Sequence, residues 1–245
     1  MTDAALARAI ADEAGALLLA IRAGADCSDR ELGQRGDREA NTLILDRLRA
    51  ARPDDFILSE ESHDDRTRCS AQRVWIIDPL DGTREYSERM DDWAVHIGLA
   101  IAGVPSVGVV ALPACGRTFA TDDRPSPPLP GPTRPRMVVS RSRAPEIATK
   151  VAASIGAELV PMGSAGAKAM AVVAGDADIY LHDGGQYEWD NCAPAAVAIA
   201  HRFHASRIDG SALVYNCHDP LLPDLLICRP EWAGRVLDAV ARLRP

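Results

Sequence analysis

The stretch Trp75-Ile-Ile-Asp-Pro-Leu-Asp-Gly-Thr-Arg84 decides how the rest of this chain is interpreted. An apolar run typical of a buried strand ends in two carboxylates, Asp78 and Asp81, which stand on either side of a turn led by Pro79. A carboxylate at the end of a buried strand is costly to desolvate unless it has a partner. Because a bound cation would turn that cost into coordination, the pattern predicts a metal site here.

Two further acidic motifs support a metal site, Ser59-Glu60-Glu61-Ser62 upstream and Trp189-Asp190 downstream. Glu60 would approach the two aspartates if its strand neighbours theirs, and the Leu80 carbonyl can point to the same side. Mg²⁺ takes about six oxygen ligands, and the absence of His and Cys from these motifs favours such a hard cation over zinc. Two ions bridged by one carboxylate would clamp the attacking and leaving oxygens of phosphoryl transfer. The motifs therefore indicate metal-dependent phosphate chemistry.

Gly82 and Thr83 follow the second aspartate at a predicted helix start. Their backbone N–H groups and the helix dipole would bind a phosphate, and the Thr83 hydroxyl is placed to hold an attacking water. Taken alone, Asp-Pro-Leu-Asp-Gly-Thr is also compatible with a simple acidic β-turn. The occurrence of all three acidic motifs in one chain favours the binding site.

Composition limits the partners of the chain. Its 245 residues suffice for one large domain or two small ones, and its formal net charge of −8 argues against a nucleic-acid polymer or an anionic membrane as partner. An acidic protein can still bind a small phosphate ester through metal ions. The six scattered cysteines form no C-x-x-C pair and are typical of reduced cytosolic thiols. With no basic n-region and no apolar run near the ~20 residues of a membrane span, we expect a cytoplasmic location.

The sequence pattern predicts an α/β (α+β) protein in two halves. The N-terminal half, 1–124, carries the Glu-Glu and Asp-Pro-Leu-Asp-Gly-Thr motifs, and the C-terminal half, 136–245, carries the Trp-Asp motif and the substrate-side residues. Between them, 122–136 is predicted to be a loop because no helix or central strand tolerates so many prolines. Helices are predicted over 3–23, 37–51, 144–155, 165–174, 190–200 and 231–243, and strands over 56–58, 74–77, 93–102, 107–112, 137–139, 159–160 and 177–181.

The three acidic motifs together resemble the signature of the lithium-sensitive, Mg²⁺-dependent phosphatase superfamily. Its members include inositol monophosphatases, some fructose-1,6-bisphosphatases and 3′(2′),5′-bisphosphate nucleotidases. The resemblance implies a layered αβαβα sugar-phosphatase fold, two or three Mg²⁺ ions in the active site, inhibition by lithium, and a homodimer. It also implies two metal sites, one formed by Glu60, Asp78 and the Leu80 carbonyl, the other by Asp78, Asp81 and Asp190.

The same resemblance implies the catalytic roles. A water activated by the metal ions, Glu60 and Thr83 would attack phosphorus in line, without a covalent enzyme intermediate. The family usually has Thr-x-x-Asp before the second helix, and its Asp supports the threonine. Here Asn41 falls where that Asp is expected, and Asp37, one helical turn earlier, is the candidate substitute. An inactive metal- and nucleotide-binding sensor is the non-enzymatic alternative, which retention of the acidic motifs disfavours.

Residues beyond the acidic motifs separate the subfamilies. Asp81-Gly-Thr-Arg-Glu-Tyr86 resembles the Asp-Gly-Thr-Lys-Glu-Phe of bacterial CysQ-type nucleotidases more than the Asp-Gly-Thr-Thr-Asn-Phe of inositol monophosphatases, and 163–175 resembles a nucleotidase segment beside the nucleotide phosphate. This implies hydrolysis of 3′-phosphoadenosine 5′-phosphate to AMP and phosphate in sulfate assimilation, with inositol monophosphatase or fructose-1,6-bisphosphatase activity as the alternative. The implied substrate-binding residues are Gly82, Thr83, Ser164, Lys168, Asp190 and His182, the last standing where the nucleotidases usually carry Arg.

The residues themselves leave two of these substrate contacts open. Lys168 lies in an otherwise uncharged, small-residue segment, where its ammonium requires a partner. A phosphate would serve, and so would a nearby carboxylate. Ser164 is equally compatible with a plain N-cap of the helix that follows it.

Overall fold

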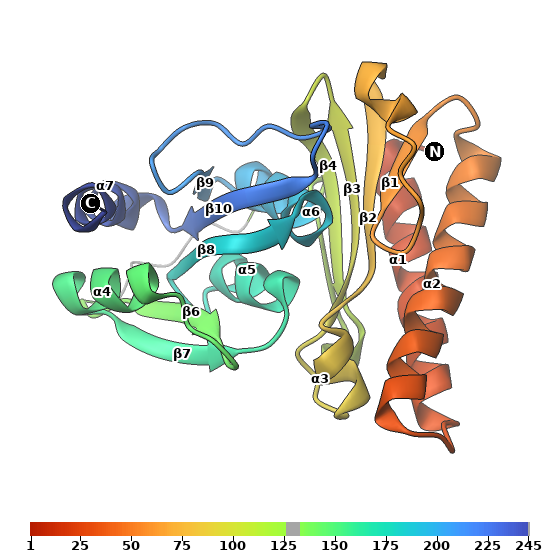
Figure 1. Ribbon diagram of the computed structural model, residues 1–245, viewed down its shortest axis with the longest axis horizontal. Coiled ribbons are helices and arrows are strands. Elements are labelled where there is room, and N and C mark those ends of the chain that lie inside the picture. Colours follow the sequence, from red (N-terminus) through yellow and green to blue (C-terminus); the bar gives the residue numbers. More distant parts are fainter. Residues whose placement is uncertain (126–132, 245) are drawn as a thin grey trace.

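The computed structural model describes residues 1–125 and 133–244, which form two five-stranded sheets and three layers of helices (Figure 1). Helices α1 and α2 cover the outer face of the first sheet, α5 and α6 lie between the sheets, and α4 and α7 cover the outer face of the second. This confirms the predicted α/β class and the layered αβαβα fold.

The elements, in chain order, are α1 (Asp3–Ala23), α2 (Asp29–Ala51), β1 (Phe56–Ser59), a 3₁₀ turn η1 (Thr67–Ser70), β2 (Arg73–Asp81), α3 (Thr83–Ser87), β3 (Ala94–Ile101), β4 (Val104–Leu112), a 3₁₀ turn η2 (Pro113–Cys115), β5 (Arg117–Ala120), β6 (Arg136–Ser140), α4 (Glu146–Ile155), β7 (Glu158–Met162), α5 (Ala165–Ala174), β8 (Ile179–Tyr187), α6 (Glu188–Ala200), β9 (His204–Ser206), β10 (Leu221–Cys228) and α7 (Pro230–Leu243). In the described part of the chain, no helix is both long and apolar enough to cross a membrane.

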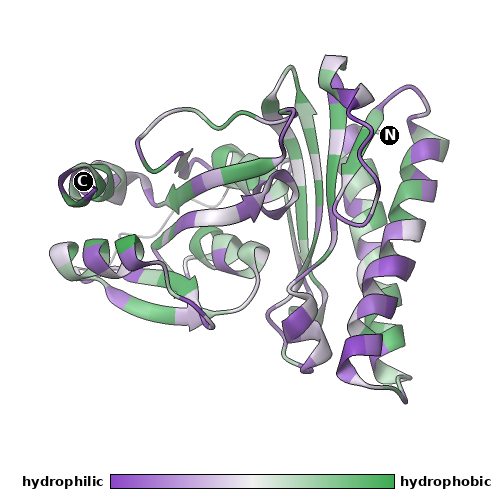
Figure 2. Cartoon of the chain, in the orientation of Figure 1, coloured by the Kyte–Doolittle hydropathy of each residue, from purple (hydrophilic) through white to green (hydrophobic). Residues whose placement is uncertain are grey.

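The first sheet has the strand order β1-β2-β3-β4-β5, with β1 parallel to β2 and the other neighbours antiparallel. Strand β2 is apolar on both faces because both are covered. Trp75 and Ile77 pack against α1 and α2, whereas Val74 and Ile76 pack against the central helices. Figure 2 shows the resulting hydrophobic stretches along this sheet.

The pairing of β2 with β3 breaks where the two aspartates lie. Asp78 is opposite His96, but Asp81 is opposite Ala94, so a step of three residues along β2 pairs with a step of only two residues along β3. Such an irregularity bends a strand and redirects its side chains. Here it turns the end of β2 toward the central helical layer.

The second sheet has the order β7-β6-β8-β10-β9, in which β6 is parallel to β7 and β8, and β10 is antiparallel to β8 and β9. One hydrophobic core joins the two sheets: it contains Ile76 of β2, Val138 of β6, Met170 of α5 and Cys192 of α6. The central helices therefore pack on both sheets at once, and the ends of β2, α5 and α6 meet in the same layer.

Helix α2 begins eight residues earlier than predicted. Ser28 and Glu31 form a capping box, with the Glu31 N–H donating to the Ser28 hydroxyl at 3.4 Å and the Ser28 N–H donating to Glu31 at 3.0 Å. Gly33 and Gly36 weaken the helix signal in this first part. Both are close-packing positions, since a Cβ at Gly33 would lie 2.8 Å from Thr83 Cγ2 and one at Gly36 would lie 3.0 Å from Leu80 Cδ2.

Several strands were also placed differently or missed. The strand predicted over 177–181 is β8, which begins at Ile179 and continues to Tyr187, and β5, β9 and β10 were not predicted. Helices α1 and α5 have the predicted bounds. Of the predicted proline-rich loop, 126–132 lies outside the described residues, and β6 starts at Arg136.

Candidate active site

Three carboxylates from two distant parts of the sequence meet at the inner edge of the first sheet. Asp78 and Asp81 come from the end of β2, and Asp190 comes from the first turn of α6. Their ligand atoms all lie within 4.8 Å of one another. Three carboxylate oxygens at this spacing match the ligands that Mg²⁺ and other hard cations prefer, so the residues fit a divalent ion.

The charge balance of the cluster supports the same conclusion. Burial and repulsion from Glu60 and Asp81 raise the pKa of Asp78 well above its ordinary range. Burial and repulsion from Asp81 raise the pKa of Asp190 to about 7. These shifts arise because like charges are held together away from water. A divalent cation would remove the repulsion and keep the carboxylates ionised.

Asp81 differs from its two neighbours because donors surround it. Its carboxylate accepts hydrogen bonds from the Ala165 N–H at 3.1 Å and the Gly166 N–H at 2.6 Å, both at the start of α5, and His96 Nε2 lies 3.2 Å from its Oδ2. Burial opposes ionisation of Asp81, but the charge and hydrogen bond of His96 and the bond from Gly166 outweigh it and lower the pKa. Asp81 is therefore the fixed anion of the cluster.

Glu60 lies at the exposed rim of this cluster. Strands β1 and β2 are parallel, with Ser59 opposite Ile77, and the Glu60 N–H donates to the Ile77 carbonyl at 3.2 Å. This brings Glu60 beside Asp78, as the sequence predicted for neighbouring strands. Although Glu60 is exposed as a residue, protein packed around its carboxyl and repulsion from Asp81 raise its pKa, while a hydrogen bond with Asp78 opposes the shift.

The Thr83 hydroxyl lies between two acceptors, Asp37 Oδ1 and the Leu80 carbonyl, each at 3.2 Å. Asn41 does not take part. It accepts a hydrogen bond from Ser59 at 2.7 Å and donates one to Ser62 at 3.3 Å. The two positions are one helical turn apart, about 6 Å along α2, so only Asp37 is level with the threonine. Thr83 thus has an acidic partner, Asp37, as the family pattern leads one to expect. Asn41, which stands at the position where the family usually has that acid, contacts Ser59 and Ser62 instead.

Burial, together with repulsion from Glu61 and Glu60, raises the pKa of Asp37 to about 7. Gly82 adopts a left-handed φ of +87°, and a Cβ there would lie 2.9 Å from Ser164 Cβ. Helix α3 starts at Thr83 as predicted but has only five residues. Any phosphate contact at this point would therefore depend on individual N–H groups rather than on a helix dipole.

The predicted substrate-side residues have local partners. Ser164 is the N-cap of α5, accepting from the Ala167 N–H at 3.0 Å. The Lys168 ammonium donates to the carbonyls of Gly163 and Ser164 and lies 5.4 Å from the Tyr180 ring. Neither a phosphate nor a carboxylate is thus needed to explain its burial, although burial lowers its pKa.

His182 lies near the same cation. Its Nε2 is 2.8 Å from the Gly184 carbonyl, and burial and the charge of Lys168 lower its pKa to about 4. The ring is therefore neutral at pH 7, and its single N–H is donated to that carbonyl. In this arrangement its other nitrogen is an acceptor.

The structure also reveals contacts that the sequence did not identify. His96 is completely buried and lies between Asp81 and the Trp189 carbonyl. Glu188 is buried at the start of α6 and accepts from the N–H groups of Asn216 and Cys217, each at 2.7 Å. Only the antiparallel register of β3 could have indicated His96, because it places that residue opposite Asp78.

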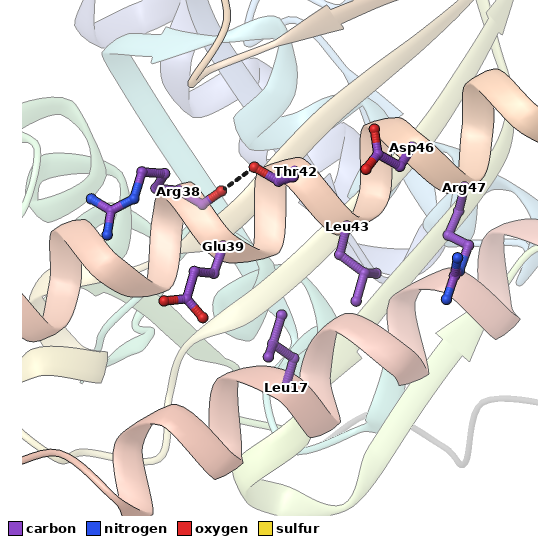
Figure 3. Close-up of a pocket in the computed structure, with 7 residues that line it drawn as sticks. All are labelled: Leu17, Arg38, Glu39, Thr42, Leu43, Asp46 and Arg47. Atoms are coloured by element: carbon purple, nitrogen blue, oxygen red, sulfur yellow. Dashed lines mark hydrogen bonds between the residues drawn. The ribbon is translucent and has the colours of Figure 1, made fainter.

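A pocket lies on the outer surface of α1 and α2 (Figure 3). The Thr42 hydroxyl donates to the Arg38 carbonyl at 2.9 Å on its wall. It lies on the other side of the first sheet from the carboxylate cluster, and its lining residues are Leu17, Arg38, Glu39, Thr42, Leu43, Asp46 and Arg47. Its charged groups are of both signs, so it does not resemble a phosphate-binding site.

The fold and the acidic cluster define a metal-dependent phosphatase of the layered αβαβα type. The profile of the Inositol monophosphatase family matches residues 3–216, and the chain belongs to this family. It is 51% identical over 255 residues to a 3′-phosphoadenosine 5′-phosphate phosphatase of Mycobacterium leprae, an alignment covering 98% of this chain and 94% of the relative.

Solved structures have the same fold. Inositol monophosphatase II of Staphylococcus aureus superimposes with a TM-score of 0.81 at 20% identity, covering 98% of each chain. CysQ of Bacteroides thetaiotaomicron, described as a bacterial member of the inositol monophosphatase family, superimposes with a TM-score of 0.77 at 27% identity, covering 93% of this chain and 97% of that one.

Proposed function

We propose that this protein is a cytoplasmic, Mg²⁺-dependent phosphatase that removes the 3′-phosphate of 3′-phosphoadenosine 5′-phosphate, giving AMP and phosphate. The observation that carries the proposal is the cluster of Asp78, Asp81 and Asp190 beside the Thr83–Asp37 pair. The substrate is supported by the 51% identity to a phosphatase of that specificity over nearly the whole chain. Similarity at 20% identity to an inositol monophosphatase supports the fold alone.

We assign one metal position to Glu60, Asp78 and the Leu80 carbonyl, and a second to Asp78, Asp81 and Asp190. Mg²⁺ at these positions would supply positive charge to the phosphate oxygens as the phosphoryl group transfers. The site lies between the two predicted halves, 1–124 and 136–245, which we propose as the two structural units of the chain. A homodimer, usual for the family that the sequence resembles, is the proposed assembly.

The Thr83–Asp37 pair would orient the attacking water. With Asp37 ionised, the Thr83 hydroxyl donates its hydrogen to that carboxylate, which leaves its lone pairs to accept a hydrogen from water. Glu60, at the exposed rim of the cluster, is placed to take the water proton as general base. The new bond forms between the water oxygen and phosphorus, and the bond to the ester oxygen breaks.

The substrate would lie against the start of α5. The N–H groups of Gly82 and Thr83 and the side chain of Ser164 would contact phosphate oxygens. Lys168 uses two of its three N–H donors on carbonyls, so one donor is left for a substrate phosphate. His182 would contribute a weaker contact, because its N–H faces Gly184.

The test is phosphate release from 3′-phosphoadenosine 5′-phosphate, fructose 1,6-bisphosphate and inositol 1-phosphate, measured in parallel with Mg²⁺ and with EDTA. We expect activity only with Mg²⁺, inhibition by lithium, and a kcat/KM at least about a hundredfold higher for the nucleotide, since sites that hydrogen-bond a substrate group discriminate strongly against its absence. Comparable values for all three would refute the assigned specificity. Metal binding without phosphate release from any of them would instead support a sensor.

A further inference from the structure

His96 lies beside β2 and α6, the two elements that carry the three clustered carboxylates, and against the start of α5. It lies on β3, opposite Asp78 across the irregular pairing with β2. The side chain is 0% exposed. A fully buried, polar ring in an apolar strand requires partners for both nitrogens, and those partners identify what the ring does.

Each ring nitrogen faces an acceptor. Nδ1 lies 3.1 Å from the Trp189 carbonyl at the start of α6, and Nε2 lies 3.2 Å from Asp81 Oδ2. Because a carbonyl and a carboxylate both accept, the ring fits as a double donor. The Nε2–Asp81 contact has the length of an ion pair, but within the described residues Nε2 makes no hydrogen bond of acceptable geometry. A close contact of this kind between opposite charges is strongly attractive in a buried setting.

The ring is also held in place from the side of α5. An ideal Cβ on Gly166 would overlap His96 Nε2, at well under 3.0 Å, and would lie 3.0 Å from Ala94 Cβ. The N–H of the same glycine donates to Asp81 Oδ2 at 2.6 Å. The imidazole therefore fills the space between β3, the first turn of α5 and the first turn of α6.

We propose that His96 is the positioning residue of the metal site: it fixes the Asp81 carboxylate and ties the start of the helix that carries Asp190 to the same point. The proposal rests on the proposed metal site, because it assigns His96 a role toward ligands of that site. His96 would not touch metal or substrate. It acts through Asp81 and the Trp189 carbonyl, as outer partners do when they orient metal-ligating carboxylates.

Two amide substitutions separate the two contacts. In His96→Asn the amide reaches only as far as Nδ1, so it can donate to the Trp189 carbonyl but not to Asp81. In His96→Gln the amide nitrogen reaches the position of Nε2 and can donate to Asp81. Both variants remove the same imidazole and are uncharged. Because each variant keeps one contact and loses the other, a difference between them reports the relative weight of the Asp81 and Trp189 contacts and not the loss of charge.

The primary measurement is Mn²⁺ binding to metal-free protein, followed by the electron paramagnetic resonance signal of free Mn²⁺. We expect His96→Asn to bind Mn²⁺ about tenfold to a hundredfold more weakly than His96→Gln at one site, with a lower kcat at saturating metal and an unchanged KM. Mn²⁺ affinity equal to that of wild type in both variants, or tighter binding by His96→Asn than by His96→Gln, would overturn the proposal. Absence of Mn²⁺ binding by the wild-type protein would instead overturn the metal site itself, and the role of His96 with it.

A second measurement uses the intact ring, so it does not depend on the variants folding. In wild-type protein with ¹⁵N-labelled histidine, the Nε2 resonance of His96 should shift when Mg²⁺ is added, because ligation changes the charge on the Asp81 carboxylate. The shift should be lost in Asp81→Asn. A wild-type Nε2 resonance that does not respond to saturating Mg²⁺ would overturn the proposal.

Discussion

Replacing Gly166 by alanine tests whether the start of α5 must lie against the active site. The added methyl group would overlap the His96 ring, and an ordinary contact of 3.4 Å requires the helix start or the ring to move by about 1 Å. The Gly166 N–H, which donates to Asp81 at 2.6 Å, would move with the helix. A displacement of about 1 Å in catalytic geometry costs about a hundredfold in rate, so we expect kcat to fall by about that factor.

Stability should change far less than activity. Overpacking a buried site costs about 1–3 kcal/mol, but alanine gains about 1 kcal/mol over glycine within a helix. The net loss of about 0–2 kcal/mol corresponds to a fall in Tm of about 0–8 °C, at about 2–4 °C per kcal/mol for a chain of this size. Gly234 in α7 is the matched control, because a Cβ there meets nothing within 4 Å, and Gly234→Ala should raise Tm and leave kcat unchanged. Thermal unfolding and Mg²⁺-dependent phosphate release measure both quantities, and a Gly166→Ala protein with wild-type kcat would refute the reasoning.

Asp81→Asn should lower kcat by several orders of magnitude, because charge stabilisation by the second metal is lost; near-normal phosphate release would show that the ligand set is wrong. Lys168→Ala should raise KM more for 3′-phosphoadenosine 5′-phosphate than for a monophosphate. Equal increases in KM for the two substrates in steady-state assays would show that the lysine has only a structural role in α5. In metal-free protein the pKa values of Asp37 and Asp190 are each raised to about 7, above the ordinary value of about 3.9. Protonation of these two carboxyls in the folded protein therefore adds to the free energy of unfolding at about pH 4. This contribution is lost as pH rises through about 7. Without metal, Tm should fall over this range more steeply in wild type than in Asp190→Asn, and parallel curves would contradict the assigned shift.

The fold was predictable where a sequence signal and the packing agree. Helix α5 is short, consists mostly of small and apolar residues apart from Lys168, and is followed by Gly175 in a left-handed conformation, so its bounds were predicted correctly. Strand β10 was missed because Pro223 and Asp224 interrupt its apolar pattern. In the structure its pairing with β8 shifts between Leu222 and Asp224, and a proline is tolerated in a strand at such an irregularity.

The candidate site was predictable at the level of its charges. The pair of carboxylates at the end of an apolar strand predicted a cation at Asp78 and Asp81, the family resemblance implied that Asp190 shares it, and the structure brings the three side chains together. Their supporting contacts were not predictable. Whether Asp37 or Asn41 faces Thr83 depends on the position of α2 along its own axis relative to the first sheet. That position is set by tertiary packing and cannot be inferred from a local sequence pattern.

The close packing of α6 on the first sheet determines the separation of the three carboxylates. Gly98 and Gly108 lie under this helix, and a Cβ on Gly98 would be 3.0 Å from Cys192 Sγ, while one on Gly108 would overlap the Ala193 carbonyl. The helix thus packs on the first sheet as closely as its backbone allows, and this sets how near Asp190, at its first turn, comes to β2. The distance between the carboxylates is therefore a consequence of sheet–helix packing. Side chains at these glycines would push α6 outward and separate Asp190 from Asp81 while leaving every ligand in the sequence.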